Sequence, residues 1–280
     1  MLTRRNFISM TASTAILMGL GACGGSSDGA SASAGGSDAA ATSDASSFTT
    51  VQEGKLIGLS DMSYPPLESI NTSTNEPEGF EIDLADAIAG KLGLQMEWKP
   101  PVKFDTIIPT IKQGGTADVG ISAFSITPDR EEEIDFSDSY LDSNQGVVTR
   151  ADATDTTEEA LNQAGKKISC QSGTTGEDWI RENLTNAECV PLDDPIQAVT
   201  GVQTGLYAAC VLDLPVGSYL CSQSYTDCQV AIEIPTGEQY GIVVSKDNPG
   251  LTAAINKALA ELEDDGTLAD LETKWFGQEL

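Results

Sequence analysis

Arg130 lies near the start of a predicted helix, where it could bind an anion. Arg130 follows Thr127-Pro128, a pair that fits the N-cap and the first position of a helix. A guanidinium group donates two parallel hydrogen bonds to a carboxylate, and the helix dipole adds to that attraction. The alternative is a surface arginine paired with the acidic run Glu131–Glu133. The residues alone leave both interpretations open.

Two further stretches offer binding chemistry. Gly173-Thr174-Thr175-Gly176 precedes a predicted helix, whose free backbone N–H groups can bind an anion without a basic side chain. The alternative there is an ordinary N-cap formed by Thr175. Asp213 ends a predicted strand and offers a carboxylate, but it is one of 43 acidic residues, most of which are expected to be solvated.

The composition excludes several classes of function. The chain has 280 residues, with 15 Lys plus Arg against 43 Asp plus Glu and a formal net charge of −28. Nucleic-acid binding needs clustered basic residues, so we expect no nucleic-acid partner. Histidine is absent, which excludes His-based triads, His-ligated zinc and His general bases. With no CxxC pair either, we expect no metal and no cofactor.

The N-terminal 47 residues are predicted to lie outside any fold. Residues 1–22 have two arginines and then an interrupted apolar run, as in an export signal. Leu20-Gly21-Ala22-Cys23 resembles the lipobox of bacterial lipoproteins, and the start resembles a twin-arginine signal. Residues 23–47 would then be a lipidated Cys23 and a flexible tether. We therefore expect export by the twin-arginine or Sec route and a lipid anchor on the outer side of the cell membrane.

The remaining cysteines fall in one stretch: Cys170, Cys189, Cys210, Cys221 and Cys228. An exported protein permits disulfides, and an odd number leaves at least one thiol free or paired with another molecule. Proximity favours Cys221 with Cys228, and the other pairings stay open.

From Phe48 onward, short β-type runs alternate with amphipathic helical patterns, which indicates an α/β fold. The predicted strands are Lys55–Ser60, Gln95–Lys99, Asp118–Ser122, Gly146–Arg150, Lys167–Gln171, Cys189–Leu192, Ala208–Asp213 and Tyr240–Ser245. The predicted helices are Asp83–Leu92, Phe104–Gln113, Gly176–Leu184, Pro195–Thr204, Leu251–Glu263 and a last one that ends at Gly277.

Seven short motifs follow one another in a fixed order over residues 55–277. They are Tyr64-Pro65-Pro66-Leu67-Glu68, a run from Gly79 to Ile88, Ile108-Pro109, a run from Ser125 to Arg130, Asp135-Phe136-Ser137-Asp138, a run from Gln171 to Gly176, and the tail around Asp265-Gly266 and Trp275-Phe276-Gly277. Together they resemble the polar-amino-acid-binding proteins of bacterial ABC importers, extracellular solute-binding protein family 3.

The resemblance implies a two-lobed α/β fold of the periplasmic-binding-protein type II (Venus-flytrap) kind, with two crossing hinge strands. Lobe 1 would comprise residues 48–142 and 238–280. Lobe 2, residues 143–237, would be inserted between them.

The resemblance also implies a ligand site for an amino acid between the lobes. Arg130 would bind the carboxylate and Asp213 the ammonium, with Thr174 and Thr175 at the helix start. Asp61 would disfavour acidic ligand side chains, although Lys103 can neutralise it. The expected ligand-binding residues are Asp61, Tyr64, Phe104, Ser122, Ala123, Ser125, Arg130, Gln171, Thr174, Thr175 and Asp213.

The implied function is that of an extracytoplasmic receptor, a monomer, which captures a polar L-amino acid and delivers it to an ABC permease. Basic and amide side chains are slightly favoured as cargo because of Asp61. A ligand-sensing lipoprotein of the same fold that feeds no permease is one alternative. A dehydratase-type enzyme of similar fold is the other, and we expect no catalytic residue.

Overall fold

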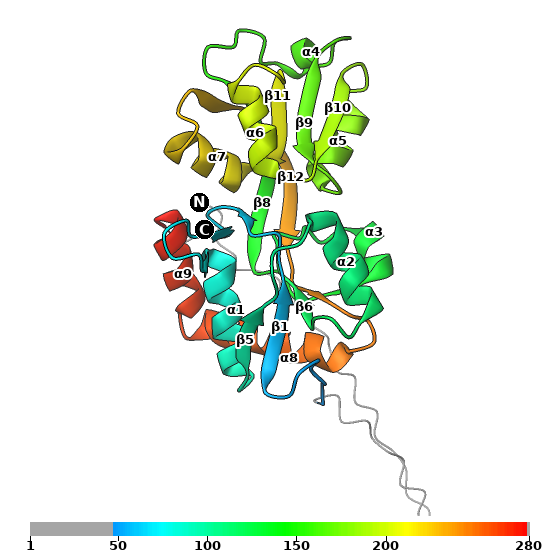
Figure 1. Cartoon of the computed structure of the whole chain (residues 1–280), viewed down its shortest axis with the longest axis vertical. Coiled ribbons are helices and arrows are strands. Elements are labelled where there is room, and N and C mark those ends of the chain that lie inside the picture. Colours follow the sequence, from blue (N-terminus) through cyan, green and yellow to red (C-terminus); the bar gives the residue numbers. More distant parts are fainter. Residues whose placement is uncertain (1–46, 279–280) are drawn as a thin grey trace, which may run out of the picture. The chain divides into compact units, whose positions relative to one another are not determined.

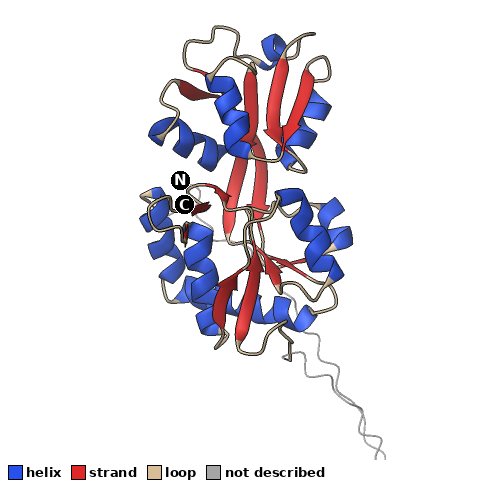
Figure 2. Ribbon diagram, viewed as in Figure 1, coloured by secondary structure: helices blue, strands red, loops and turns tan. Residues whose placement is uncertain are grey.

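The computed structural model describes residues 47–278, which lie within one compact unit. The predicted signal segment 1–22, Cys23 and nearly all of the tether lie outside the described residues. Two five-stranded sheets and one small three-stranded sheet organise the described part, and helices flank both larger sheets (Figures 1 and 2). The α/β prediction is therefore confirmed.

The first lobe is built on a sheet with strand order β5-β1-β6-β13-β7. The strands are β1 (Lys55–Leu59), β5 (Gln95–Trp98), β6 (Val119–Gly120), β7 (Asp135–Phe136) and β13 (Val243–Val244). The helices are α1 (Phe80–Lys91), α2 (Phe104–Gln113), α3 (Pro128–Glu133), α8 (Pro249–Asp264) and α9 (Thr267–Phe276). Four of the five β1 residues are buried, which explains its apolar run KLIGL. At Gly58, a Cβ atom would lie 2.7 Å from the Trp98 ring and 2.3 Å from the end of the Met96 side chain, so a larger residue there would displace both.

The second lobe is built on a sheet with strand order β10-β9-β11-β8-β12. The strands are β8 (Leu141–Arg150), β9 (Lys167–Gln171), β10 (Glu188–Leu192), β11 (Ala209–Asp213) and β12 (Cys228–Tyr240). The helices are α4 (Glu158–Leu161), α5 (Thr175–Asn183), α6 (Pro195–Gln203) and α7 (Leu214–Gln223). Strands β9, β10 and β11 are parallel, so the residues that follow β9 and end β11 meet at the same edge of the sheet.

Two long antiparallel strands connect the lobes. β8 pairs with β12 from Arg150 with Cys228 to Leu141 with Tyr240, and the pairing is irregular between Ile234 and Glu238. β8 runs from the first lobe into the sheet of the second, and β12 runs back toward the first (Figure 1). An isolated bridge joins Ser125 to Tyr240, so the end of β12 also contacts the first lobe. β8 and β12 are the two hinge strands that the resemblance implied.

The small sheet lies beside α1 and positions two residues of the site. Its strands are β2 (Ser63–Tyr64), β3 (Glu68–Ile70) and β4 (Pro77–Glu78), all antiparallel. The register of β2 with β3 pairs Tyr64 with Glu68. Both side chains are buried, which holds them on the first lobe at fixed positions.

Three sequence predictions need correction. The first predicted helix begins at Phe80, since the buried Phe80 ring packs on Phe276 of α9, with ring centroids 5.4 Å apart. The predicted strand Tyr240–Ser245 is divided, because Gly241 separates the end of β12 from β13. All five described cysteines are thiols, so the predicted disulfide between Cys221 and Cys228 is not formed in the structure.

Within residues 47–278, no helix combines the length and the apolar character that a membrane crossing requires. The predicted lobe bounds, 48–142 with 238–280 and 143–237, stay a prediction.

Candidate functional site

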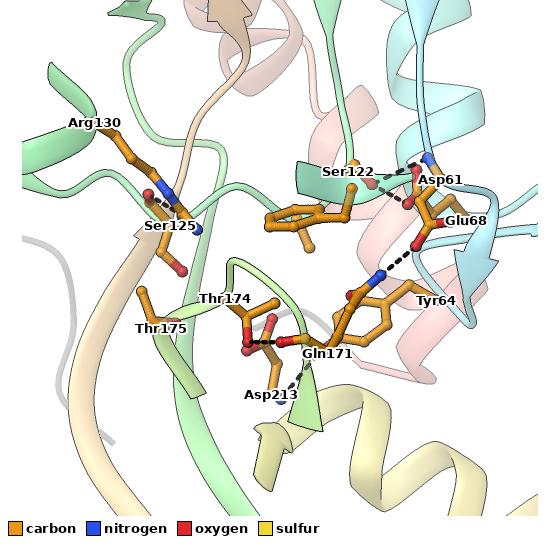
Figure 3. A pocket seen from close by; sticks show the side chains of 12 residues that line it. Asp61, Tyr64, Glu68, Ser122, Ser125, Arg130, Gln171, Thr174, Thr175 and Asp213 are labelled. Atoms are coloured by element: carbon orange, nitrogen blue, oxygen red, sulfur yellow. Dashed lines mark hydrogen bonds between the residues drawn. The ribbon is translucent and has the colours of Figure 1, made fainter. Parts of the chain in front are cut away.

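A narrow cavity is lined by residues of both lobes (Figure 3). All eleven residues predicted from the sequence line it, and Glu68 is the twelfth. The lining residues are Asp61, Tyr64, Glu68, Phe104, Ser122, Ala123, Ser125, Arg130, Gln171, Thr174, Thr175 and Asp213. The structure therefore brings the predicted residues together, and their roles toward a ligand stay predictions.

Arg130 reaches the cavity from the short helix α3. Thr127 is the N-cap of this helix and accepts a hydrogen bond from the Arg130 N–H, and Pro128 occupies the first turn, as predicted. The guanidinium Nη1 donates to the Ser125 carbonyl at 2.8 Å, and Nη2 donates to the Gly173 carbonyl of the other lobe at 3.0 Å. The alternative of a surface ion pair with Glu131–Glu133 is therefore wrong. Burial lowers the pKa of Arg130, and the carboxylates of Asp213 and Glu238 oppose this effect.

Aromatic rings fix the plane of this guanidinium. Its carbon lies 5.5 Å from the ring centroid of Phe104 and 5.6 Å from that of Phe124. The two rings are stacked on each other with centroids 4.5 Å apart. Cation–π contacts of this kind orient the guanidinium without using its N–H donors. The remaining donors of Arg130 can therefore be directed to a carboxylate.

The turn before α5 presents the second lobe to the cavity. Thr174 is the N-cap of α5 and accepts a hydrogen bond from the Glu177 N–H, so the alternative with Thr175 as N-cap is wrong. Thr175 is the first residue of the helix. Gly173 has a φ of +77°, a conformation that favours glycine, and this turn directs its carbonyl to Arg130. The turn thus contributes to the cavity and to the contact between lobes.

Asp213 lies at the end of β11 and is buried. Its carboxylate accepts a hydrogen bond from the Tyr240 hydroxyl at 2.6 Å, and its backbone N–H donates to the Tyr64 hydroxyl at 3.0 Å. Burial, with the nearby carboxylate of Glu238, raises the pKa of Asp213 to about 7, against the opposing effect of Arg130. A positively charged group placed beside it would restore the ionised form.

Asp61 lies at the end of the cavity opposite Arg130 (Figure 3). It is half-buried and accepts hydrogen bonds from the Ser63 hydroxyl and from the Gln171 side-chain amide of the second lobe. Figure 3 shows the Gln171 side chain directed toward Asp61. Burial raises the pKa of Asp61, and the carboxylates of Asp194 and Asp105 add to the rise.

Lys103 does not neutralise Asp61, contrary to the alternative considered above. Its ammonium group pairs with Asp193 of the second lobe at 2.5 Å, with both side chains about 60% exposed. This end of the cavity therefore keeps an unpaired carboxylate.

Glu68 was missed by the sequence reasoning. It is fully buried, and its carboxyl accepts hydrogen bonds from the hydroxyls of Ser60 and Ser122, which belong to two different loops of the cavity. Burial raises its pKa well above the usual range, and Glu81 nearby adds to the rise. A buried glutamate has no sequence pattern of its own. Its position next to Tyr64-Pro65-Pro66-Leu67 was the only available signal.

Glu81 holds the cavity loop that contains Ser122 and Ala123. It accepts a hydrogen bond at 2.8 Å from the backbone N–H of Ala123 and another from the hydroxyl of Tyr140. Ala123 has a φ of +50°, which is strained for a residue with a Cβ atom. Strain of this type is typical of functional sites, where surrounding contacts impose the conformation.

Gln145 and Glu238, one from each hinge strand, were also missed. The Gln145 amide nitrogen lies within hydrogen-bond distance of Asp213, Thr175 and Glu238. The Glu238 carboxylate accepts from the hydroxyls of Thr175, at 2.8 Å, and Ser125. The hinge strands therefore connect Asp213 and Thr175 of the second lobe with Ser125 of the first. Among residues 47–278, no group of acidic or cysteine side chains is arranged to hold a metal ion.

Comparison with known proteins agrees with this geometry. The family model for bacterial extracellular solute-binding proteins, family 3, matches residues 56–278. The chain belongs to this family. It is 29% identical to the L-cystine-binding protein TcyJ of Escherichia coli (strain K12) over 225 residues, which cover 80% of this chain and 83% of that protein. It is 30% identical to the ABC transporter arginine-binding protein 1 of the same organism over 220 residues, or 77% and 88% of the two chains.

The fold of this family-3 protein also matches solved structures. An ancestral arginine-binding protein bound to arginine superposes with a TM-score of 0.74 at 34% identity, over 80% of this chain and 98% of that one. The prediction of a two-lobed periplasmic-binding-protein fold is confirmed. Each of these relatives is named as a binding protein, which agrees with the expectation of a binding role.

Proposed function

We propose that this protein is the amino-acid-binding component of an ABC importer and binds a polar L-amino acid between its two lobes. The observation that carries the proposal is that Arg130 and Asp213 line the same cavity. A carboxylate and an ammonium on the same α-carbon need one cationic and one anionic partner, both shielded from water. The eleven predicted residues, with Glu68, would line the ligand.

The side-chain end of the cavity favours a cationic or amide ligand. Among residues 47–278, no basic side chain forms an ion pair with Asp61, and the carboxylates of Asp105 and Asp194 lie close enough to raise its pKa. A ligand guanidinium or ammonium would relieve this accumulation of negative charge, whereas a ligand carboxylate would add to it. The names of the arginine-binding relatives agree with such a preference.

Ligand binding and lobe closure would be coupled. A ligand that contacts Arg130 and Asp61 on one lobe and Asp213 on the other stabilises the closed arrangement over an open one. An ABC permease would bind the closed form of lobes 48–142 with 238–280 and 143–237. Lipidation of Cys23 and the tether 23–47 would hold the protein, as a monomer, at the outer surface of the membrane.

The test is a thermal-shift screen of the chain with each of the twenty amino acids and cystine. A ligand present at about 100 times its Kd adds roughly 2.7 kcal/mol, which raises the melting temperature by several degrees. We expect the largest rise with arginine, lysine or glutamine. No rise with any of these compounds would overturn the proposal.

Arginine and citrulline provide a sharper comparison, since the two differ mainly in the charge of the terminal group. We expect calorimetry to give a Kd for arginine about 10- to 150-fold lower than for citrulline, the value of a hydrogen bond to a charged group. Asp61→Asn should reduce this ratio to near one. Equal affinities in the wild-type protein would contradict the role of Asp61.

A further inference from the structure

Two cysteines of the second lobe lie on neighbouring strands with their sulfur atoms in contact. Cys170 is on β9 and Cys189 on β10, and the two Sγ atoms are 3.8 Å apart. In the parallel register, Cys170 is opposite Pro191, and Cys189 is opposite Ile168. The two cysteines are therefore offset by two positions and point to the same face of the sheet.

The separation is small enough for a bond. A disulfide has its sulfurs about 2.0 Å apart, so side-chain rotation with a small shift of the strands must remove roughly 1.8 Å. β10 is the edge strand of this sheet, with no strand beyond it to resist such a shift. Within residues 47–278, no other two cysteine sulfurs are in hydrogen-bond contact. Cys210, Cys221 and Cys228 are buried or half-buried elsewhere in the lobe.

The two thiols differ in access. Cys170 is fully buried in the cluster that includes Ile180 of α5, whereas Cys189 is half-exposed. Burial raises the pKa of both thiols, and the cation of Arg181 opposes this rise at Cys189. Cys189 is therefore the thiol that an external oxidant can reach, and Cys170 is placed to react with the product.

We propose that Cys170 and Cys189 form a disulfide when the protein meets a disulfide-type oxidant outside the cytoplasm. The Cys189 thiolate attacks the oxidant's S–S bond to give a mixed disulfide and releases one thiol. The Cys170 thiolate then attacks Cys189 Sγ, forming the Cys170–Cys189 bond and releasing the second thiol. The two cysteines lose two electrons and two protons, and the oxidant gains them. Proteins of extracellular families meet conditions in which such bonds persist.

The position of the bond connects it to the cavity. Cys170 directly precedes Gln171, whose side chain contacts Asp61 across the lobes. The loop from Gln171 to Thr175 begins at this point and lines the cavity. A Cys170–Cys189 bond would anchor the start of that loop to the neighbouring strand β10.

The first test counts and maps thiols in the full chain carrying Cys23→Ser, which leaves the five cysteines of the second lobe. The protein is incubated with glutathione disulfide, unfolded in denaturant so that buried thiols are accessible, alkylated and digested without reduction, and its peptides are measured by mass spectrometry. We expect two of the five thiols to escape alkylation and one cross-linked peptide pair to contain Cys170 and Cys189. Alkylation of all five thiols, or protection of Cys221 with Cys228 alone, would overturn the proposal.

The second test compares melting temperatures of oxidised and reduced protein. Closing a loop of about 20 residues should raise the melting temperature by roughly 6–12 °C. Cys189→Ser, at a half-exposed position, should abolish this rise, and the matched control Cys221→Ser should keep it. A rise that persists in Cys189→Ser, or that is absent in the wild-type protein, would refute the proposal.

Discussion

Replacement of Arg130 should weaken ligand binding more than replacement of any other single residue. Its guanidinium is stacked on Phe104 and held by the carbonyls of Ser125 and Gly173, so its remaining donors are fixed in direction. Truncating one partner of a buried, hydrogen-bonded charge pair costs about 2–5 kcal/mol, which is a 30- to 4,000-fold increase in Kd for Arg130→Ala. Arg130→Lys keeps the charge and loses the two-pronged geometry, so its Kd should rise about 10- to 150-fold.

Titration calorimetry with the ligand identified by the screen would measure both variants. Arg150→Ala is the matched control, because Arg150 pairs with Asp152 at 2.8 Å and lines no part of the cavity. Its Kd should stay within about threefold of wild type. The reasoning would be refuted if Arg130→Ala, folded as judged by its ligand-free melting temperature, bound within threefold of wild type, or if lysine restored full affinity.

Three further results are expected. Ionised Asp213 is needed for the ligand ammonium, so Kd should rise up to tenfold per pH unit as the pH falls below about 7. The ligand-free protein should gain stability over the same range, because the raised pKa of Asp213 favours its protonated form, and Glu81, whose pKa burial also raises to about 7, adds to this gain. Asp213→Asn should flatten the Kd profile, and a wild-type Kd independent of pH would argue against this role. Glu68→Gln should change Kd only a few-fold, because the raised pKa of Glu68 already favours a neutral group. Glu68→Ala removes the hydrogen bonds with Ser60 and Ser122 and should lower the melting temperature by about 4–12 °C. An unchanged melting temperature in the alanine variant would contradict the role of these hydrogen bonds. Lys103→Met should raise Kd by less than about fivefold, because the ion pair of Lys103 with Asp193 is exposed to solvent. 1 M salt should remove this effect. A larger or salt-independent change in Kd would contradict a weak, exposed ion pair between the lobes.

Local patterns were enough to predict most elements of the fold. The helix Phe104–Gln113 and the strand Lys167–Gln171 were predicted at the bounds that the structure gives, because apolar periodicity and the flanking glycines act within each segment. β12 was not predicted as a strand. Much of it is half-buried or exposed, and its partner β8 lies about 90 positions earlier in the chain, so no local alternation marks it.

Some residues of the site could likewise be predicted from local patterns, and others could not. The residues of recognisable motifs, such as Arg130 after Thr127-Pro128, could be found because helix-start chemistry has a local pattern. Glu68, Gln145 and Glu238 could not, because their importance arises from burial and from partners on other segments. Gln145, for example, contacts Asp213, which is 68 positions away. Only the folded chain brings such groups into one network.

The contacts between the lobes use the same residues as the proposed ligand contacts. Arg130 donates to Gly173, Gln171 donates to Asp61, and the backbone of Asp213 donates to Tyr64. Truncation of the Arg130, Gln171 or Tyr64 side chain would therefore remove a closure contact together with a proposed ligand contact. Because residues in one network do not contribute independently, double substitutions across the cavity should cost less than the sum of the single ones. Such non-additivity is what coupling of ligand binding to closure predicts, because the ligand contacts and the closure contacts stabilise the same arrangement of the lobes.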